Sequence, residues 1–418
     1  MMAFLYPFLT LMQPGILFPA LDVVHPMQLV SAVALLMVLA QRQLSGAEVK
    51  RRLSHPAMLA VFAFVLLQVA SRFRYGLGSM TEVFSFWSAF AIFVAVSVLL
   101  IATERDFRNY MWGMILGGSV VVCFGLLAVA QHSPKLAGGR AGAYGMYENH
   151  NDYSFAILTI FPFAWQLVRI TAGFTKRVLL YAVLLACVAG TFLSLSRGGM
   201  LCLVLAGGML IWKSMSGMRR MLVIGIFGVL AMGAVLYQFA AREENQRGHY
   251  TAEDAKSSRY ELWRAARKMV VAHPILGVGS GRFNEFAGDY EELSHDQKGK
   301  VSHNTFLEVA TGSGLTGLAA FTMMLIAVLR VSSPKAAAYS AIPEPLVSAT
   351  FICALTMIAR GMLDAKPHDW SYYFLAVVAV SIGSLQQRSP QRSPEQVTEP
   401  AAAATARSGR PRVYNRVA

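Results

Sequence analysis

The segment SSRYELWRAARKMVVAHPILGVGSGRF, residues 257–283, lies in the one long polar interruption of an otherwise apolar sequence. The interruption ends at SHNTFLEVATGSGLTG, residues 302–317, where the chain becomes apolar again. The first piece concentrates Arg and Lys, and the second begins with a His and an Asn. A cationic segment beside a titratable side chain at a membrane boundary suits the handling of a lipid-linked phosphate.

The composition around this interruption is that of a membrane protein. The chain has 418 residues, of which 55% are hydrophobic and 14% charged, whereas soluble domains carry about 25% charged residues. Apolar runs of the length that crosses a bilayer, about 20 residues, recur along most of the sequence. We therefore expect an all-α polytopic membrane protein with about twelve transmembrane helices and one long periplasmic loop that contains an amphipathic helix.

The twelve expected spans divide the chain into four parts. A transmembrane bundle of about nine spans occupies residues 1–239, a periplasmic loop 240–303, and a bundle of about three spans 304–386. A basic cytoplasmic tail, rich in Pro, Ala, Ser and Arg and expected to be disordered, occupies 387–418. The individual spans are expected near 3–21, 26–41, 55–71, 83–102, 108–131, 153–171, 178–196, 198–212, 220–239, 304–330, 345–363 and 370–386.

The formal net charge of +14 is explained better by topology than by binding to nucleic acid, which we do not expect. Lys and Arg are far more frequent in the short segments on the side of the two termini than on the side of the 240–303 loop. By the positive-inside rule, both termini are then cytoplasmic and the loop is periplasmic. The Arg residues of the tail either touch anionic membrane lipids or only anchor the topology.

The N-terminus and the cysteines add little to the functional interpretation. The sequence MMAFLYPFLTLM has no positive region or cleavage site of a signal peptide, so we expect it to begin the first span. Cys123, Cys187, Cys202 and Cys353 lie in expected spans without paired spacing, which predicts small packing residues.

The long loop is polarised along its length. Basic residues dominate 256–282 and acidic residues dominate 283–296. A helix is expected from Ser257 to about Ala272, with Arg259, Trp263 and Arg267 along one side because they recur every four residues. Arg264 and Lys268 form the neighbouring row. We expect this Arg-rich helix to lie on the outer face of the membrane.

Two arginines are candidates for phosphate binding, because a guanidinium matches phosphate oxygens with two parallel hydrogen bonds. Arg197 lies between two apolar runs and precedes two glycines, which would let a ligand approach the backbone; the alternative is an Arg that reaches to the interface. Arg259 lies in the amphipathic helix, although spacing alone does not choose it over Arg264 or Arg267. Further candidates for substrate binding are Arg264, Arg282, Asn304, Glu308, Arg360 and Asn149.

His303 is the candidate general base, since histidine accepts a proton near neutral pH; the alternative is a plain interfacial residue. Asn304 either orients it or caps the next span. Glu308 follows one turn later and needs a partner or a water-filled cavity. On the same side of the membrane, Asn149 lies in a polar cluster that either binds sugar hydroxyls or starts a helix, and Arg360 and Asp364 are most simply an ion pair.

The sequence does not predict a nucleotide-binding site or a metal site. The glycines at 277, 279 and 281 follow a helix rather than a strand, so they predict a tight turn and not a nucleotide loop. The sequence has no HExxH, CxxC or DxD motif, and we expect neither a metal nor another cofactor.

Three motifs in order, SLSRGG at 194–199, the 257–283 segment and SHNTFLEVATGSGLTGLAAF at 302–321, resemble the O-antigen ligase superfamily, which includes Wzy-type polysaccharide polymerases. The resemblance covers about 140–330 by motif. It implies a multi-pass enzyme of the bacterial inner membrane that moves a glycan from undecaprenyl diphosphate to a periplasmic acceptor by an inverting, metal-independent mechanism. The two key Arg and one His of the superfamily correspond to Arg197, Arg259 and His303.

The resemblance leaves the acceptor open. An O-antigen ligase uses lipid A–core, whereas a polymerase of O-antigen or exopolysaccharide uses a second lipid-linked glycan. A transporter is a third hypothesis, although the polar residues gather in the loop and not at mid-membrane. A ligase that glycosylates proteins is a fourth, and such enzymes are usually longer.

Overall fold

The computed structural model describes residues 1–41, 44–133, 139–245, 252–338 and 340–386. Within these ranges the chain is helical and has no strand. The basic tail expected from residue 387 onward lies outside the described residues. The helices are α1 (Met2–Met12), α2 (Pro14–Leu17), α3 (Pro26–Gln41), α4 (Gly46–Leu53), α5 (Pro56–Ala70), α6 (Leu77–Leu100), α7 (Glu104–Ala130), α8 (His150–Ile170), α9 (Phe174–Leu193), α10 (Arg197–Ser214), α11 (Gly217–Asn245), α12 (Ala252–Ala272), α13 (Phe283–Tyr290), α14 (Thr305–Val331), α15 (Pro334–Ala337), α16 (Glu344–Gly361) and α17 (Trp370–Gln386), with short 3₁₀ turns at η1 (Pro19–Val24), η2 (Phe73–Tyr75), η4 (Gly145–Tyr147) and η5 (His295–Gln297).

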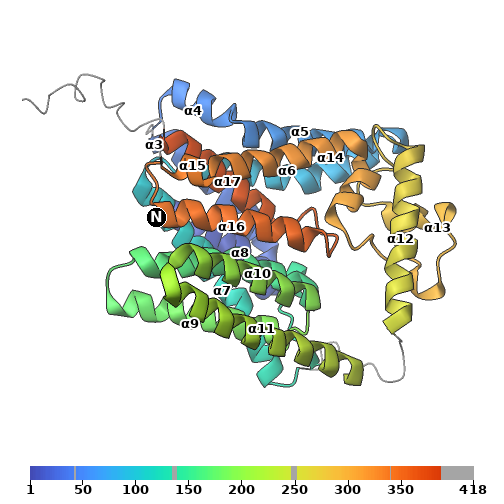
Figure 1. Ribbon diagram of the computed structural model, residues 1–418. Helices are drawn as coiled ribbons and strands as arrows, with labels where there is room; N and C mark the ends of the chain where they lie inside the picture. Colours follow the sequence, from blue (N-terminus) through green and yellow to red (C-terminus); the bar gives the residue numbers. More distant parts are fainter. Residues whose placement is uncertain (42–43, 134–138, 246–251, 339, 387–418) are drawn as a thin grey trace, which may run out of the picture.

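The long helices run side by side as one bundle, and α12 runs across their ends (Figure 1). The N-terminus lies at the opposite end of the bundle from α12 (Figure 1). One end of the bundle therefore holds the N-terminus, and the other end holds the long polar segment that includes α12.

The membrane character of the bundle is confirmed, whereas the number of spans stays a prediction. Among the described residues, seven helices are long and apolar enough to cross a bilayer, namely those within 56–75, 77–100, 104–130, 150–170, 174–193, 217–238 and 305–331. The other expected spans coincide with helices that are shorter or more polar. The expected span 3–21 is not one helix, because Gln13 has a left-handed backbone (φ 50°) and Pro14 starts a new helix.

The bundle has a buried centre and an apolar rim that the protein itself does not cover. In α8, 78% of the apolar window is buried inside the protein, against 11% in α11, so α8 is central and α11 presents apolar side chains outward. Cys187, Cys202 and Cys353 are buried as expected for packing residues. Cys123 is exposed on α7, so the expectation that it packs inside the protein is wrong.

The amphipathic helix ends at Ala272 as expected but begins at Ala252, five residues before the expected start. Its apolar stripe does not form a lipid-facing surface. Leu262, Ala265, Ala266 and Met269 are fully buried and pack with Phe283, Ala287 and other side chains of the following segment. The apolar face of α12 is therefore satisfied by the protein itself, and this holds the helix across the bundle end.

The glycine-rich turn after α12 is docked on a break in α14. The α14 backbone is non-helical at Ser313 and Gly314, which frees carbonyl groups there. Val278 N–H donates to the Thr311 carbonyl (2.7 Å) and Gly279 N–H to the Gly312 carbonyl (3.0 Å). The tight turn predicted from the glycine spacing is thus confirmed, and its purpose is a close contact between two backbones.

Gly314 tests this close contact. It has a positive φ of 73°, and a Cβ there would lie 2.1 Å from the Ile275 carbonyl oxygen. We expect Gly314→Ala to destabilise the protein by at least about 3 kcal/mol, since strain and overpacking add. The measurement is the melting temperature of the purified protein. Gly225→Ala in α11 is the control, because a Cβ there meets nothing within 4 Å; equal melting temperatures for the two variants would contradict the account.

Candidate functional site

The candidate site lies at the end of the bundle that faces α12, where several helix ends meet. His303 lies two residues before the first residue of α14, Arg197 begins α10, and Arg360 lies in the last turn of α16. Because helix N-termini carry partial positive charge, the starts of α10 and α14 favour anions at this end of the bundle.

His303 is tied to the end of α16 through a carboxylate. Its Nδ1 lies 3.4 Å from Oδ1 of Asp364, and Oδ2 of the same carboxylate pairs with Arg360 Nη2 at 3.0 Å. The backbone of His303 is left-handed (φ 51°), an uncommon conformation for a residue with a side chain. The strained backbone and the shared carboxylate together fix the direction of the imidazole.

Arg360 is the deepest charge in this arrangement, with only 1% of its side chain exposed. Besides Asp364, it donates to Ser154 Oγ (3.0 Å) and to the Asn151 carbonyl (2.9 Å), both at the start of α8. Its guanidinium also lies 4.6 Å from the centroid of the Phe155 ring. These contacts supply the partners that a buried charge requires, and they join α16 to α8.

The start of α10 is joined to the same network. Ser196 Oγ caps the helix by accepting from Gly199 N–H (3.2 Å) and donates to the Asn151 side chain (2.8 Å). A Cβ at Gly198 would lie 3.4 Å from Arg360 Nη1, and one at Gly199 would lie 2.7 Å from Ser154 Cβ. The space beside these two glycines is occupied by side chains of the protein. The sequence had instead led us to expect a ligand in that space. Arg197 follows the cap directly and is half-buried.

The α12 helix brings Arg259 to this network. Trp263 Nε1 donates to the Ser302 carbonyl (3.0 Å), directly before His303, and Arg259 lies one turn earlier on the same side of α12. The Arg259 side chain is exposed at the protein surface, but partial desolvation of its guanidinium lowers its pKa. The charges of Asp364, Arg197 and Arg360 also act on this pKa. Arg197 and Asp364 therefore both act on the charge of Arg259, and Asp364 also contacts His303. The three candidates Arg197, Arg259 and His303, from three distant segments, thus share one electrostatic environment.

The pKa of Asp364 supports a role for this residue as a permanent carboxylate. Burial alone would raise its pKa, but the hydrogen bond from His303 and the charge of Arg360 outweigh burial, and the net pKa is lower than usual. The carboxylate consequently stays ionised at neutral pH and favours the tautomer in which Nδ1 of His303 carries the proton. That leaves Nε2 as the nitrogen that can accept a proton from a substrate.

A second ion pair supports the loop after α16, and the sequence analysis missed it. Lys366 Nζ pairs with Asp152 at the start of α8 and also donates to the Met146 carbonyl. Thr305, the first residue of α14, donates to the Asp364 carbonyl (2.8 Å) and accepts from Lys366 N–H (3.0 Å). The signal in the sequence was the density of polar residues in DAKPHD, residues 364–369, at the end of an apolar run.

Two candidate residues next to His303 have structural partners. Asn304 caps α14 by accepting hydrogen bonds from the N–H groups of Phe306 (2.9 Å) and Leu307 (3.1 Å). Capping was one of the two roles expected for this residue. Glu308 accepts from Ser302 N–H (3.0 Å). Both residues therefore fix the loop that carries His303.

Arg264 and Arg282 pair with residues outside the His303 network, whereas Asn149 bonds to Asn151, which belongs to it. Arg264 pairs with Glu291 (2.9 Å), together with Lys268 (2.7 Å); the acidic part of the loop thus folds back on the basic helix. Arg282 pairs with Glu285 (2.5 Å). Asn149 caps α8 by accepting from Asn151 N–H (2.8 Å), so it serves as a helix start.

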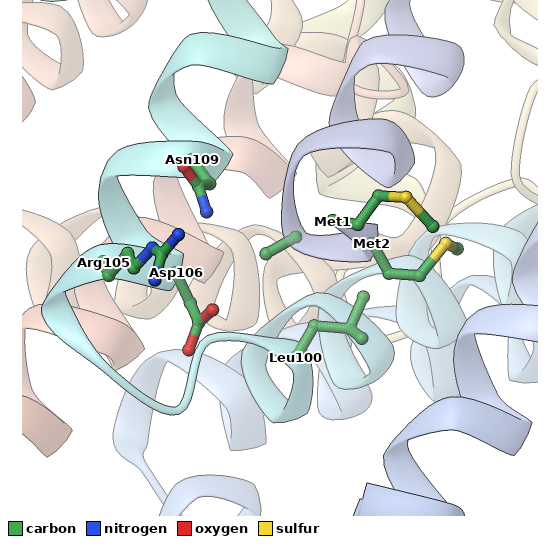
Figure 2. A pocket seen from close by; sticks show the side chains of 7 residues that line it. Met1, Met2, Leu100, Arg105, Asp106 and Asn109 are labelled. Atoms are coloured by element: carbon green, nitrogen blue, oxygen red, sulfur yellow. The ribbon is translucent and has the colours of Figure 1, made fainter.

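A cavity at the far end of the bundle is unrelated to this site. Figure 2 shows this cavity, of about 250 Å³, beside the N-terminus and the turn between α6 and α7. It is lined by Met1, Met2, Ala3, Leu100, Arg105, Asp106 and Asn109. None of the residues expected from the sequence to carry chemistry lines it.

Comparison with known proteins identifies the segment that holds the site. Residues 182–322 match the family model described as O-antigen ligase. Over these residues the chain is similar to the O-antigen ligase family. The matched segment runs from α9 into α14 and contains Arg197, Arg259 and His303, whereas Arg360 and Asp364 lie beyond it. The resemblance to the O-antigen ligase superfamily is confirmed.

A curated relative of this chain comes from Rhizobium meliloti (strain 1021). It is the exopolysaccharide production protein ExoQ, which is 26% identical over 248 residues. The alignment covers 55% of this chain and 56% of the relative. The chain thus spans about half the length of the curated relative that it matches.

Asp364→Asn tests the electrostatic account of the site. Because the pKa of Asp364 is lower in the folded protein than its ordinary value near 4, the carboxylate stabilises the fold above about pH 4 and this stabilisation is lost as the pH falls further. We expect the variant to lose about 2 kcal/mol at pH 7, with a difference from the native protein that shrinks below pH 4.

The measurement is the melting temperature as a function of pH. Asp289→Asn, at an exposed position on α13, is the matched control and should change little at any pH. A loss in Asp364→Asn that is as large at pH 3 as at pH 7 would contradict the account.

Proposed function

We propose that this protein is a membrane-embedded glycosyltransferase that moves a glycan from undecaprenyl diphosphate to an acceptor at the periplasmic face of the bacterial inner membrane. The observation that carries the proposal is the shared environment of two arginines and a histidine from three separate segments: Arg197, Arg259 and His303. The O-antigen ligase match over 182–322 supports it, since that segment contains all three residues.

The arginines bind and neutralise the diphosphate of the donor. Arg197 and Arg259 approach from the bundle and from α12, and the charge of the first acts on the pKa of the second. Two guanidiniums that act on each other electrostatically repel, and an anion between them lowers this repulsion. A diphosphate supplies that anion, and its charge grows as the glycosidic C–O bond breaks, so the two cations stabilise the transition state more than the ground state.

His303 activates the acceptor. Nε2 takes the proton from the acceptor hydroxyl as the hydroxyl oxygen bonds to the anomeric carbon from the face opposite the diphosphate. The C–O bond to the diphosphate breaks, and the electron pair leaves with undecaprenyl diphosphate. The resulting imidazolium is stabilised by Asp364 through Nδ1, and the configuration at the anomeric carbon is inverted. Asp364 is a positioning residue here, because it acts on the substrate only through His303.

The acceptor distinguishes two versions of this function. Lipid A–core as acceptor makes the protein an O-antigen ligase, which the description of the matching family favours. A second lipid-linked glycan makes it a polymerase, and the similarity to an exopolysaccharide production protein favours that version. Both versions use the same donor chemistry.

A transporter fits the arrangement less well. In many transporters the substrate site is near the bilayer midplane, between broken helices. Here Arg197, His303 and Arg360 lie at helix ends, on the side of the bundle covered by α12. With the positive-inside orientation, this side is periplasmic and both termini are cytoplasmic.

The three residues can be tested by substitution. We expect His303→Ala and Arg259→Ala each to lower glycan transfer by at least about 100-fold, the contribution of a general base or of a transition-state cation. The measurement is glycan on the cell surface, with the amount of protein in the membrane determined in parallel.

Lys268→Ala serves as the matched control on α12, because Lys268 pairs with Glu291 and not with the His303 network. It should retain most of the transfer activity. Native glycan display from His303→Ala, or an equal loss in Lys268→Ala, would refute the assignment of roles.

A deletion strain identifies the acceptor. Lipid A–core without long glycan, together with accumulated lipid-linked glycan, is expected for a ligase. Core that carries a single repeat, or loss of a secreted polysaccharide with an intact core, is expected for a polymerase. Native amounts of every surface glycan would contradict both versions and leave the transporter.

A further inference from the structure

A second cavity lies at the same end of the bundle but at the other end of α12. Its volume is about 410 Å³, and it separates the turn after α5 from the turn after α12. Phe73 and Arg74 line one wall, and His273, Ile275 and Leu276 line the other. Counting 1.5 Å per helical residue, the fourteen residues from Arg259 to His273 place this groove about 20 Å from Arg259.

The walls of the groove are apolar and open to the outside. Phe73 is 74% exposed and Ile275 is 68% exposed. The neighbouring Val271 on α12 is also exposed. Phe73 belongs to the end of the apolar span Pro56–Tyr75, so this surface lies at the membrane boundary. Aromatic and apolar side chains at that depth contact lipid chains.

A cationic cluster borders the groove. The guanidinium carbons of Arg74, Arg72 and Arg282 lie 4.9, 6.0 and 4.0 Å from the centroid of the Tyr75 ring. Arg282 is paired with Glu285, and Arg72 donates to the Ser280 carbonyl (2.8 Å). Arg74, by contrast, is exposed where it lines the groove.

His273 forms the opposite border of the groove. Its Nε2 lies 2.8 Å from the hydroxyl of Tyr290. Burial and the charge of Arg74 lower its pKa, which shows that Arg74 and His273 act on each other across the groove. The border is therefore positive on one wall and carries a polar hydrogen-bonding pair on the other.

We propose that this groove is a binding site for an anionic glycerophospholipid, with one acyl chain between Phe73 and Ile275 and the headgroup phosphate on Arg74. An apolar trough alone accepts any acyl chain, and a guanidinium alone accepts any anion. Their combination at the membrane boundary selects a molecule that carries both, and an anionic lipid gains about 1 kcal/mol from each nearby Arg.

The position of the groove gives the lipid a structural consequence. One wall belongs to the α5–α6 turn and the other to the turn that ends α12, so a lipid in the groove joins the bundle to the end of α12. The opposite half of α12 carries Arg259 and Trp263. The site is thus separate from the proposed glycosyltransferase site, and its test does not depend on transfer activity.

The experiment is a titration of the delipidated full-length protein with phosphatidylglycerol or phosphatidylcholine of identical acyl chains, with bound lipid counted by native mass spectrometry. We expect the native protein to bind phosphatidylglycerol about fivefold more tightly than phosphatidylcholine. Arg74→Gln should lose this preference, and Ile275→Gln should weaken the binding of both lipids.

Arg267→Gln is the charge-matched control, because Arg267 is exposed on α12 but does not line the groove; it should keep the preference. Melting temperatures of all variants confirm that they are folded. Equal affinities of the native protein for the two lipids would overturn the proposal. So would an equal loss in Arg74→Gln and Arg267→Gln, since the effect would then be one of net charge alone.

Discussion

The buried charge of Arg360 is the constraint on which the rest of this end of the bundle depends. A guanidinium that is 1% exposed must find partners inside the protein. It finds them at the start of α8, in Ser154 and the Asn151 carbonyl, and in the carboxylate of Asp364. That carboxylate in turn reaches His303. One buried cation thus determines where α8 and α16 meet and in which direction the candidate base points.

The α12 helix acts on the other side of the same site. Its apolar stripe is buried against α13 and the loop, and Trp263 is bonded to the residue before His303. The glycine-rich turn after it is bonded to the break in α14. The helix is consequently fixed at both its middle and its end, which allows Arg259 to be held near Arg197 although 61 residues separate them in the sequence.

The sequence was informative where chemistry is local. The helix end at Ala272 and the glycine turn were predicted, and the cap was one of two roles considered for Asn304, because each depends on neighbours within a few residues. The motif resemblance also identified Arg197, Arg259 and His303. By contrast, the contact between His303 and Asp364 and the pair formed by Lys366 and Asp152 join distant segments. No spacing rule predicts such contacts, because they arise only when α8, α14 and α16 pack together.

The central claim is that Arg197 and Arg259 act on one diphosphate. The most direct test is the Kd of a polyprenyl diphosphate for the native protein, Arg197→Gln, Arg259→Gln and the double variant. Each single variant should weaken binding by about tenfold, as expected for loss of a charged hydrogen bond. The losses should be strongly non-additive, because both side chains contact the same group. Additive losses, or unchanged affinity in either single variant, would contradict the account.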